Sequence, residues 1–175
     1  MTLPKQTLTG KSINLRAVTV GDAAFILKLR LDATLNTHLS ATDPDVHKQV
    51  TWIEQHPWGQ GQYYCIVEDK NANAVGTVRL YDFQGDSFCW GSWILLPEAP
   101  RKAAIESALL VYEFGFYQLG FLRSHFDVRK QNTRVIDFHQ RLGAKIVRES
   151  ALDYFFSYSR EDYEAIKERY QSFLP

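Results

Sequence analysis

The chain has 175 residues, of which 45% are hydrophobic and 23% charged, and its 20 Lys and Arg residues balance its 20 Asp and Glu residues. This size and composition predict one compact domain over residues 1–175 that buries a substantial core. Because the net charge is zero and no basic cluster stands out, the sequence disfavours a nucleic-acid-binding protein and a polybasic membrane-surface protein.

The start of the chain contains no apolar run, and no stretch reaches the roughly 18 to 20 apolar residues that cross a bilayer. Cys65 and Cys89 lie in aromatic, strand-like segments, and two cysteines are too few for a disulfide scaffold. They also lack the close spacing to histidines that a zinc site requires. We therefore expect a cytoplasmic protein with reduced cysteines, no metal and no membrane segment.

The first predicted element is a strand at residues 13–18, where apolar and polar residues alternate. A helix follows from Gly21-Asp22, and a second helix follows Asp43-Pro44. In the second helix, we expect the Asp43 side chain to cap the first turn and Pro44 to occupy it.

Strand signals dominate the middle of the chain. Aromatic and β-branched residues predict strands at 63–68, 75–81 and 88–95. Turn residues at 71–73 and 84–86 separate them, which predicts an antiparallel meander.

A long helix is predicted over residues 101–119, because apolar residues recur at the helical period and no proline interrupts them. Gly120 is expected to end this helix. A further strand follows at 124–128. The order strand, helix, strand is typical of a parallel pair, and divergence of the two strands would open a gap for a ligand.

The last third of the chain predicts a helix at 132–142, a strand pair at 144–147 and 154–158, and a final helix capped by Ser159. Helices on a mainly antiparallel sheet make an α+β fold.

Three stretches carry a family resemblance. They are Leu15-Arg16-Ala17 with Asp22, the segment 91–98 that leads into the long helix, and the segment 132–144. In this order they resemble the GCN5-related N-acetyltransferase (GNAT) superfamily, especially the branch similar to ribosomal-protein alanine acetyltransferases. The resemblance covers roughly residues 13–170. It implies a mixed, mainly antiparallel sheet flanked by helices with a splayed central strand pair, and an enzyme that uses acetyl-CoA as co-substrate.

The resemblance places the co-substrate on the strand and loop before the long helix. The strand's main chain would bind the pantetheine arm, and one of its N–H groups would stabilise the oxyanion. The N-terminus of the helix offers N–H groups and a positive dipole to the pyrophosphate. The predicted cofactor-binding residues are Trp93, Ile94, Leu95, Leu96, Arg101, Lys102, Ala103, Ala104 and Asn132.

The loop at 98–103 departs from the family pattern, which reads Gln/Arg-x-x-Gly-x-Gly/Ala. Arg101 stands at the first glycine, Glu98 adds a negative charge, and only Ala103 fits. The same residues are also consistent with an ordinary strand-to-helix loop that carries a solvated basic pair.

Two residues of the segment 132–144 are candidates with two interpretations each. Asn132 corresponds to the family asparagine that bonds the pantetheine arm, and it is equally suited to cap its helix. His139 stands where relatives carry a tyrosine that protonates the departing thiolate. An imidazolium of ordinary pKa, about 6.5, is a stronger acid than a phenol. His139 also lies on the apolar side of its helix, as a core histidine would.

The general base is left open. Cys89 occupies the position where some relatives keep glutamate, and burial is the simplest role for this thiol. Asp82, His125 and Asp127 lie near strand ends and are candidates, and an ordered water is a further one.

The expected acceptor region is rich in aromatic residues with a few polar groups, which suits a sugar or another small polar amine. The segment 138–144 and the Tyr- and Phe-rich end of the chain also resemble acetyltransferases that modify nucleotide-linked amino sugars. This resemblance implies an acceptor of that class, with protein N-terminal acetylation or a non-catalytic CoA-binding module as alternatives. The expected partner is a small-molecule amine bound by a monomer or homodimer. The residues of this region are His38, Trp52, His56, Trp58, Tyr81, Asp82, Tyr154 and Phe155.

Overall fold

The computed structural model describes residues 4–175, and it contains one eight-stranded sheet in the order β1-β2-β3-β4-β5-β6-β8-β7. Neighbouring strands are antiparallel except for β5 and β6, which are parallel. The expected mainly antiparallel α+β fold is therefore confirmed. The strands are β1 (Leu8–Thr9), β2 (Ile13–Ala17), β3 (Gln62–Asp69), β4 (Ala74–Gln84), β5 (Ser87–Leu95), β6 (Arg123–Arg129), β7 (Lys145–Glu149) and β8 (Asp153–Ser159).

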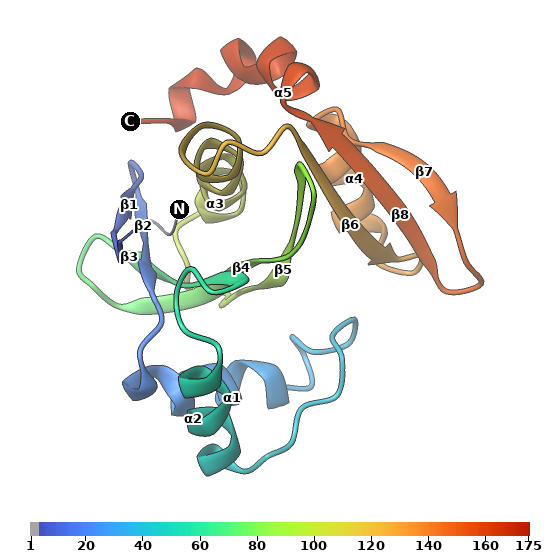
Figure 1. Ribbon diagram of the computed structural model, residues 1–175. Helices are drawn as coiled ribbons and strands as arrows, with labels where there is room; N and C mark the ends of the chain where they lie inside the picture. The colour runs from blue at the N-terminus through green and yellow to red at the C-terminus, as the bar shows by residue number, and fades with distance from the viewer. Residues whose placement is uncertain (1–3) are drawn as a thin grey trace.

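Helices cover both faces of this sheet, with α1 and α2 on one side and α3 on the other (Figure 1). The expectation of no apolar run at the start of the chain includes residues 1–3, which lie outside the described residues. No helix within residues 4–175 is both long and apolar enough to cross a bilayer. The helices are η1 (Val20–Asp22), α1 (Ala23–Leu31), α2 (Val46–Gln55), α3 (Ala103–Tyr112), η2 (Glu113–Gln118), α4 (Thr133–Arg141), α5 (Arg160–Lys167) and η3 (Glu168–Phe173).

The main core lies against α3 and is built largely from aromatic rings. The predicted helix at 101–119 begins at Ala103 and changes into the π-helical turn η2 after Tyr112. Gly115 lies in this turn, where a Cβ atom would overlap the ring of Phe88. The π-helical turn thus brings the helix backbone close to β5, an approach that only glycine permits here.

Two helix caps show where the sequence pattern was right and where it was wrong. Ser159 caps α5 as predicted, because its hydroxyl accepts the amide of Asp162 at 2.9 Å. The cap of α2 is Asp45, whose carboxylate accepts the His47 amide at 2.8 Å, and not Asp43. The Asp43 carboxylate instead accepts the amide of Asp45 at 2.9 Å. This local turn draws Asp43 away from the helix end.

A buried ion pair joins β2 to the start of α1. The Arg16 guanidinium donates to both oxygens of Asp22 at 2.8 Å, and the Thr19 amide donates to the same carboxylate at 2.8 Å. Burial would raise the pKa of Asp22, but the hydrogen bonds from Arg16 and Thr19 outweigh it and hold this pKa below its usual range. The pair fixes the position of α1 on the sheet.

Replacing Asp22 with Asn is expected to lower the free energy of unfolding at pH 7 by roughly 2 kcal/mol, because a charged hydrogen-bonding partner is lost. In the wild type, this stabilisation is complete above the unfolded aspartate pKa of about 4 and is lost as the pH falls through the lower folded pKa. Urea denaturation between pH 3 and pH 7 should therefore show a shallower pH dependence for Asp22→Asn. The exposed substitution Asp137→Asn is the control, and equal slopes for all three proteins would contradict the prediction.

Candidate active site

The parallel strands β5 and β6 pair over only one short stretch. Ser87 is opposite Arg123 and Phe88 is opposite Ser124, and no pairing follows. Beyond this point the two strands diverge (Figure 1). Trp90 of β5 and Phe126 of β6 lie inside the divergence with ring centroids 6.0 Å apart. The expected splayed strand pair is confirmed, and the main-chain edge of β5 that faces β6 is left without a strand partner.

A bulge in β5 lies at the mouth of this splay. Thr77 is opposite Ile94 but Arg79 is opposite Gly91, so Ser92 and Trp93 together oppose one residue of β4. Ser92 has a φ of 47°, and its carbonyl accepts the Thr77 hydroxyl at 2.8 Å. A bulge of this kind bends a strand and redirects its polar groups. Here it directs the β5 main chain around residues 92–95 into the gap.

The splay leads into a pocket of about 320 Å³, which we call the splay pocket. It collects residues that lie far apart in the sequence, from α1 to β8. Of the predicted site residues, Trp93, Asn132 and His139 line it. The other lining residues are Arg30, His38, Leu39, Ser40, Tyr81, Trp90, Gly91, Ser92, Phe126, Asp127, Val128, Arg129, Val135 and Asp153.

His139 is a buried wall of the splay pocket, with 4% of its surface exposed. Its ring lies 4.3 Å from that of Phe126 and 5.4 Å from that of Trp90, measured between centroids. Burial lowers the pKa of His139 to about 3, so the ring is neutral at neutral pH. His139 therefore does not have the ordinary imidazole pKa expected from the sequence, because an aromatic surround does not solvate the charged form.

The environment of His139 combines both interpretations made from the sequence. It is packed among core rings, as a core histidine would be. However, it also borders the pocket, and its Nδ1 has no hydrogen-bond partner within residues 4–175. Buried polar atoms are rarely left without a partner. His139 is therefore a wall residue of the pocket that also carries one buried nitrogen without a partner in the described chain.

Asn132 stands at the start of α4, yet its side chain makes no capping hydrogen bond. Asn132 thus occupies the N-cap position of α4 without capping the helix through its side chain. The residue also lines the splay pocket.

The predicted pyrophosphate loop lies at the end of β5. Arg101 and Lys102 are exposed there, and Ala103 is buried at the first turn of α3. The amides of Arg101, Lys102, Ala104 and Ile105 donate to no backbone carbonyl of residues 4–175. Free amides at a helix N-terminus are suited to bind an anion. The loop therefore still has amides suited to bind an anion, although Arg101 replaces a glycine.

The three candidate bases are separated by the structure. Asp82 and His125 bond to each other, with 3.1 Å between Oδ2 and Nε2, and neither lines the splay pocket. Asp127 does line it, and partial burial together with the charge of Asp153 raises the pKa of Asp127. Burial raises the pKa of Cys89 to about 12, which disfavours a thiolate nucleophile.

Two further pockets continue from the splay pocket along the face of the sheet covered by α1 and α2. The arginine pocket, about 440 Å³, shares Arg30, Ser40, Tyr81 and Ser92 with the splay pocket. It also contains Lys48, Trp52, Tyr64 and Arg79.

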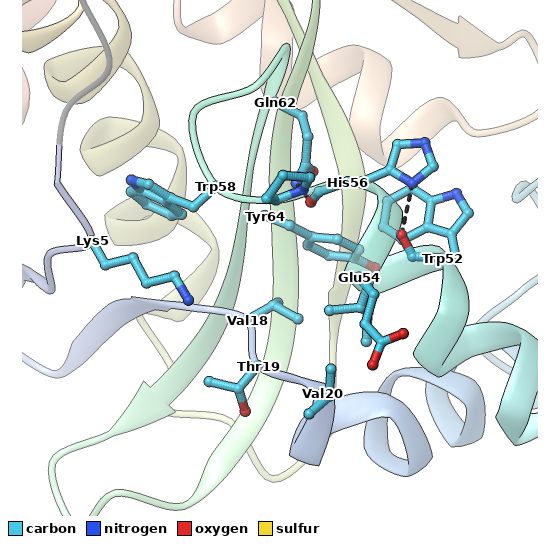
Figure 2. A pocket seen from close by; sticks show the side chains of 12 residues that line it. Lys5, Val18, Thr19, Val20, Trp52, Glu54, His56, Trp58, Gln62 and Tyr64 are labelled. Carbon is cyan, nitrogen blue, oxygen red and sulfur yellow. Dashed lines mark hydrogen bonds between the residues drawn. The ribbon is translucent and has the colours of Figure 1, made fainter.

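The aromatic pocket, about 310 Å³, lies on the other side of Trp52 and Tyr64 and includes Trp58 and His56. Figure 2 shows these rings around the pocket, with the Lys5 side chain reaching in from the N-terminal segment. The rings of Trp52 and His56 stack with centroids 4.1 Å apart. The arginine pocket thus shares lining residues with the splay pocket and with the aromatic pocket.

Most of the residues expected in the acceptor region line these pockets. His38 and Tyr81 border the splay pocket, and Trp52, His56 and Trp58 border the other two. Asp82, Tyr154 and Phe155 line none of the three. The Phe155 ring instead carries the guanidinium of Arg148, which is 4.0 Å from its centroid.

Sequence reasoning missed Arg30 and Arg79 as site residues. One feature of the sequence could have identified Arg79, because it is the charged residue within the strand pattern of 75–81. No such feature marks Arg30, since a basic residue near the end of a helix is common.

Comparison with known proteins decides the family. The model of the acetyltransferase (GNAT) domain matches residues 12–145. The chain belongs to this family. The structure of FdhC, a nucleotide-linked sugar GNAT, has a TM-score of 0.87 and 39% sequence identity, and the match covers 98% of this chain and 100% of that one. No curated protein sequence matches this acetyltransferase at a significant level.

More distant structures share the fold of this acetyltransferase. A GCN5-related N-acetyltransferase from Brucella melitensis has a TM-score of 0.81 at 18% identity, covering 100% of this chain and 88% of that one. The spermidine N-acetyltransferase from Vibrio cholerae in complex with CoA and spermine has a TM-score of 0.76 at 17% identity, covering 87% and 98%. At this identity the likeness concerns the fold alone.

Proposed function

We propose that this acetyltransferase transfers the acetyl group of acetyl-CoA to the amine of a nucleotide-linked amino sugar. The observation that carries the proposal is the splay pocket, in which the unpaired edge of β5, His139 and Asp127 face one space. The acceptor class is supported by the 39% identity to FdhC over nearly the whole chain.

The residues present suit acetyl-CoA. The amides of Arg101, Lys102, Ala104 and Ile105 and the basic side chains of Arg101 and Lys102 would bind the pyrophosphate. The bulged segment at 92–95 would bond the pantetheine arm and direct an N–H group at the thioester oxygen. The side-chain amide of Asn132 would hydrogen-bond the same arm, since it has no partner at the helix end.

The transfer needs a neutral amine, whose nitrogen adds to the acetyl carbon to form a tetrahedral oxyanion. The oxyanion collapses as the carbon–sulfur bond breaks, and the proton that the nitrogen loses on becoming an amide passes through water to the thiolate. Asp127 would accept the proton of the ammonium group, and its raised pKa makes it a stronger base than an aspartate of ordinary pKa. His139 remains neutral and would donate an N–H hydrogen bond to the thiolate sulfur as it leaves. A neutral histidine in this role stabilises developing charge without delivering a full proton.

The charges of the site favour an acceptor that carries both an amine and an anion. The splay pocket contains Asp127, and its second carboxylate, Asp153, is paired with Arg129 at 3.4 Å. Arg30, which borders both pockets, and Arg79 give the adjoining arginine pocket its positive charge. A polyamine would place positive charge beside both guanidinium groups, which is unfavourable. Protein N-terminal acetylation is the second candidate acceptor reaction, carried by the resemblance of segments 91–98 and 132–144.

The proposal is tested by calorimetry with acetyl-CoA and by an assay of thiol release. The acceptors are a nucleoside diphosphate-linked amino sugar, spermidine and a peptide with a free N-terminus. We expect acetyl-CoA to bind and the nucleotide-linked amino sugar to release thiol fastest. Absence of acetyl-CoA binding at millimolar concentration would overturn the proposal, and so would release with spermidine or the peptide alone.

A further inference from the structure

The arginine pocket contains two guanidinium groups that have no acidic partner. Within residues 4–175, no carboxylate lies within ion-pair distance of Arg30 or Arg79. The pocket has one acidic lining residue, Asp43, and its carboxylate is bound to Lys48 at 2.7 Å. The pocket therefore carries a net positive charge.

Arg79 is held in one orientation by its neighbours. Its Nε donates to the side-chain oxygen of Gln62 at 2.9 Å, and the amide of Gln62 is in turn bound to the His56 carbonyl. The guanidinium carbon lies 4.8 Å from the Trp52 ring centroid and 4.5 Å from that of Tyr81. These contacts fix the plane of the group while its two terminal nitrogens donate to no acceptor within residues 4–175.

Arg30 approaches the same pocket from α1. Its Nε donates to the Thr42 hydroxyl at 2.8 Å, and one terminal nitrogen donates to the Ser40 hydroxyl at 3.1 Å. Burial is the main cause that lowers the pKa of Arg79, and the positive charge of Arg30 acts in the same direction. Two like charges in a half-buried pocket repel each other, so the arrangement is costly without an anion between them.

We infer that the arginine pocket is the subsite for the diphosphate of the acceptor, with the free nitrogens of Arg79 as its fixed donors and Arg30 as a second cation. This inference rests on the proposed function. A planar guanidinium that is already oriented is suited to bind phosphate oxygens in pairs. Two cations match the two negative charges of a diphosphate linkage.

The order of the pockets agrees with the shape of such an acceptor. The splay pocket and the arginine pocket meet at Tyr81 and Ser92. An amino sugar in the splay pocket would thus place its anomeric phosphate in the arginine pocket.

The first test compares two acceptors that share one amino sugar, either linked to a nucleoside diphosphate or as its methyl glycoside. For Arg79→Gln we expect KM for the nucleotide-linked acceptor to rise roughly 10- to 100-fold, the range for losing charge-assisted hydrogen bonds. KM for the methyl glycoside should change less than about twofold, and Arg79→Lys should recover only part of the loss. Arg134→Gln, on the exposed surface of α4, is the matched control. An equal rise with both acceptors would overturn the subsite.

The second test does not require turnover. Pyrophosphate is titrated into the protein by calorimetry with CoA present at saturation, so that the loop at 97–105 is occupied. We expect pyrophosphate to bind the wild type and Arg134→Gln but at least 10-fold more weakly to Arg79→Gln, and malonate to bind the wild type more weakly than pyrophosphate. Melting temperatures show whether each variant is folded.

The two tests separate the subsite from the proposed function. Transfer to the nucleotide-linked amino sugar with no effect of Arg79→Gln on KM or pyrophosphate binding would leave the function standing and refute the subsite. Pyrophosphate binding that depends on Arg79, without transfer to any amino sugar, would support the anion site and refute the proposed acceptor. Tighter binding of malonate would assign the site to carboxylates and overturn the inference.

Discussion

Replacing His139 with Phe is expected to lower kcat by about 100-fold while the Kd for acetyl-CoA changes less than about threefold. A preorganised donor directed at developing charge contributes about 10² to 10³ in rate, and Phe removes the donor while keeping an aromatic ring. Stopped-flow or steady-state thiol release measures kcat, and calorimetry measures Kd.

The stability of the same variant separates a chemical role from a packing role. Nδ1 of His139 is buried without a partner in the described chain, so Phe removes an unsatisfied polar atom from an aromatic surround. We expect the melting temperature of His139→Phe to equal or exceed that of the wild type. A lowered melting temperature with unchanged kcat would show that His139 is only a core residue. His139→Gln keeps an N–H donor and should recover part of the rate.

The pH dependence of turnover gives an independent check on His139. Because burial holds its pKa at about 3, this ring does not change charge between pH 5 and pH 9. The acidic limb of the kcat profile should therefore remain at the same pH in His139→Gln. A limb that disappears in this variant would mean that the bound complex raises the pKa of His139 into the working range.

Replacing Gly76 with Ala is expected to lower the free energy of unfolding by about 3 kcal/mol, at the upper end of the usual cost of overpacking. A Cβ atom at Gly76 would overlap the carbonyl oxygen of Ile94 and lie 2.8 Å from Cδ2 of Leu95. The obstacle is mainly backbone, so β4 and β5 must separate. Urea denaturation measures the loss.

The same separation would move the segment of β5 that we propose for the pantetheine arm. Gly76 is paired with Leu95, directly after the bulge at Ser92. We therefore expect Gly76→Ala to weaken acetyl-CoA binding as well as stability. Gly21→Ala is the matched control, because its nearest atom outside the adjoining chain is 3.5 Å away. Equal effects of the two substitutions would contradict the close approach of β4 and β5.

The elements of this fold were largely predictable because each depends on contacts that are near in the sequence. The apolar period at 101–119, the turns at 71–73 and 84–86, and the cap at Ser159 are local patterns, and the structure confirms them. The wrong prediction that Asp43 caps α2 also has a local cause. Two aspartates compete for one helix end there, and the pattern alone did not distinguish them.

The family followed from the sequence, but the properties of the site did not. The bulge at Ser92 depends on the register of β5 against β4, and a local sequence pattern does not predict that register. Likewise, Arg30 and Arg79 come from α1 and β4 and meet only when α1 is fixed on the sheet by the Arg16–Asp22 pair.

The order of helices and strands was predictable from local sequence patterns, and the splayed strand pair and the acetyltransferase family from the resemblance to the GNAT superfamily. The tertiary structure decided the charge and hydrogen-bonding state of the site. A neutral His139, a raised pKa at Asp127 and two guanidinium groups without carboxylates all result from which side chains the fold brings together and which it shields from water. The pKa of a group and the partners of a charge depend on its surroundings in space, and those surroundings come from segments far apart in the chain.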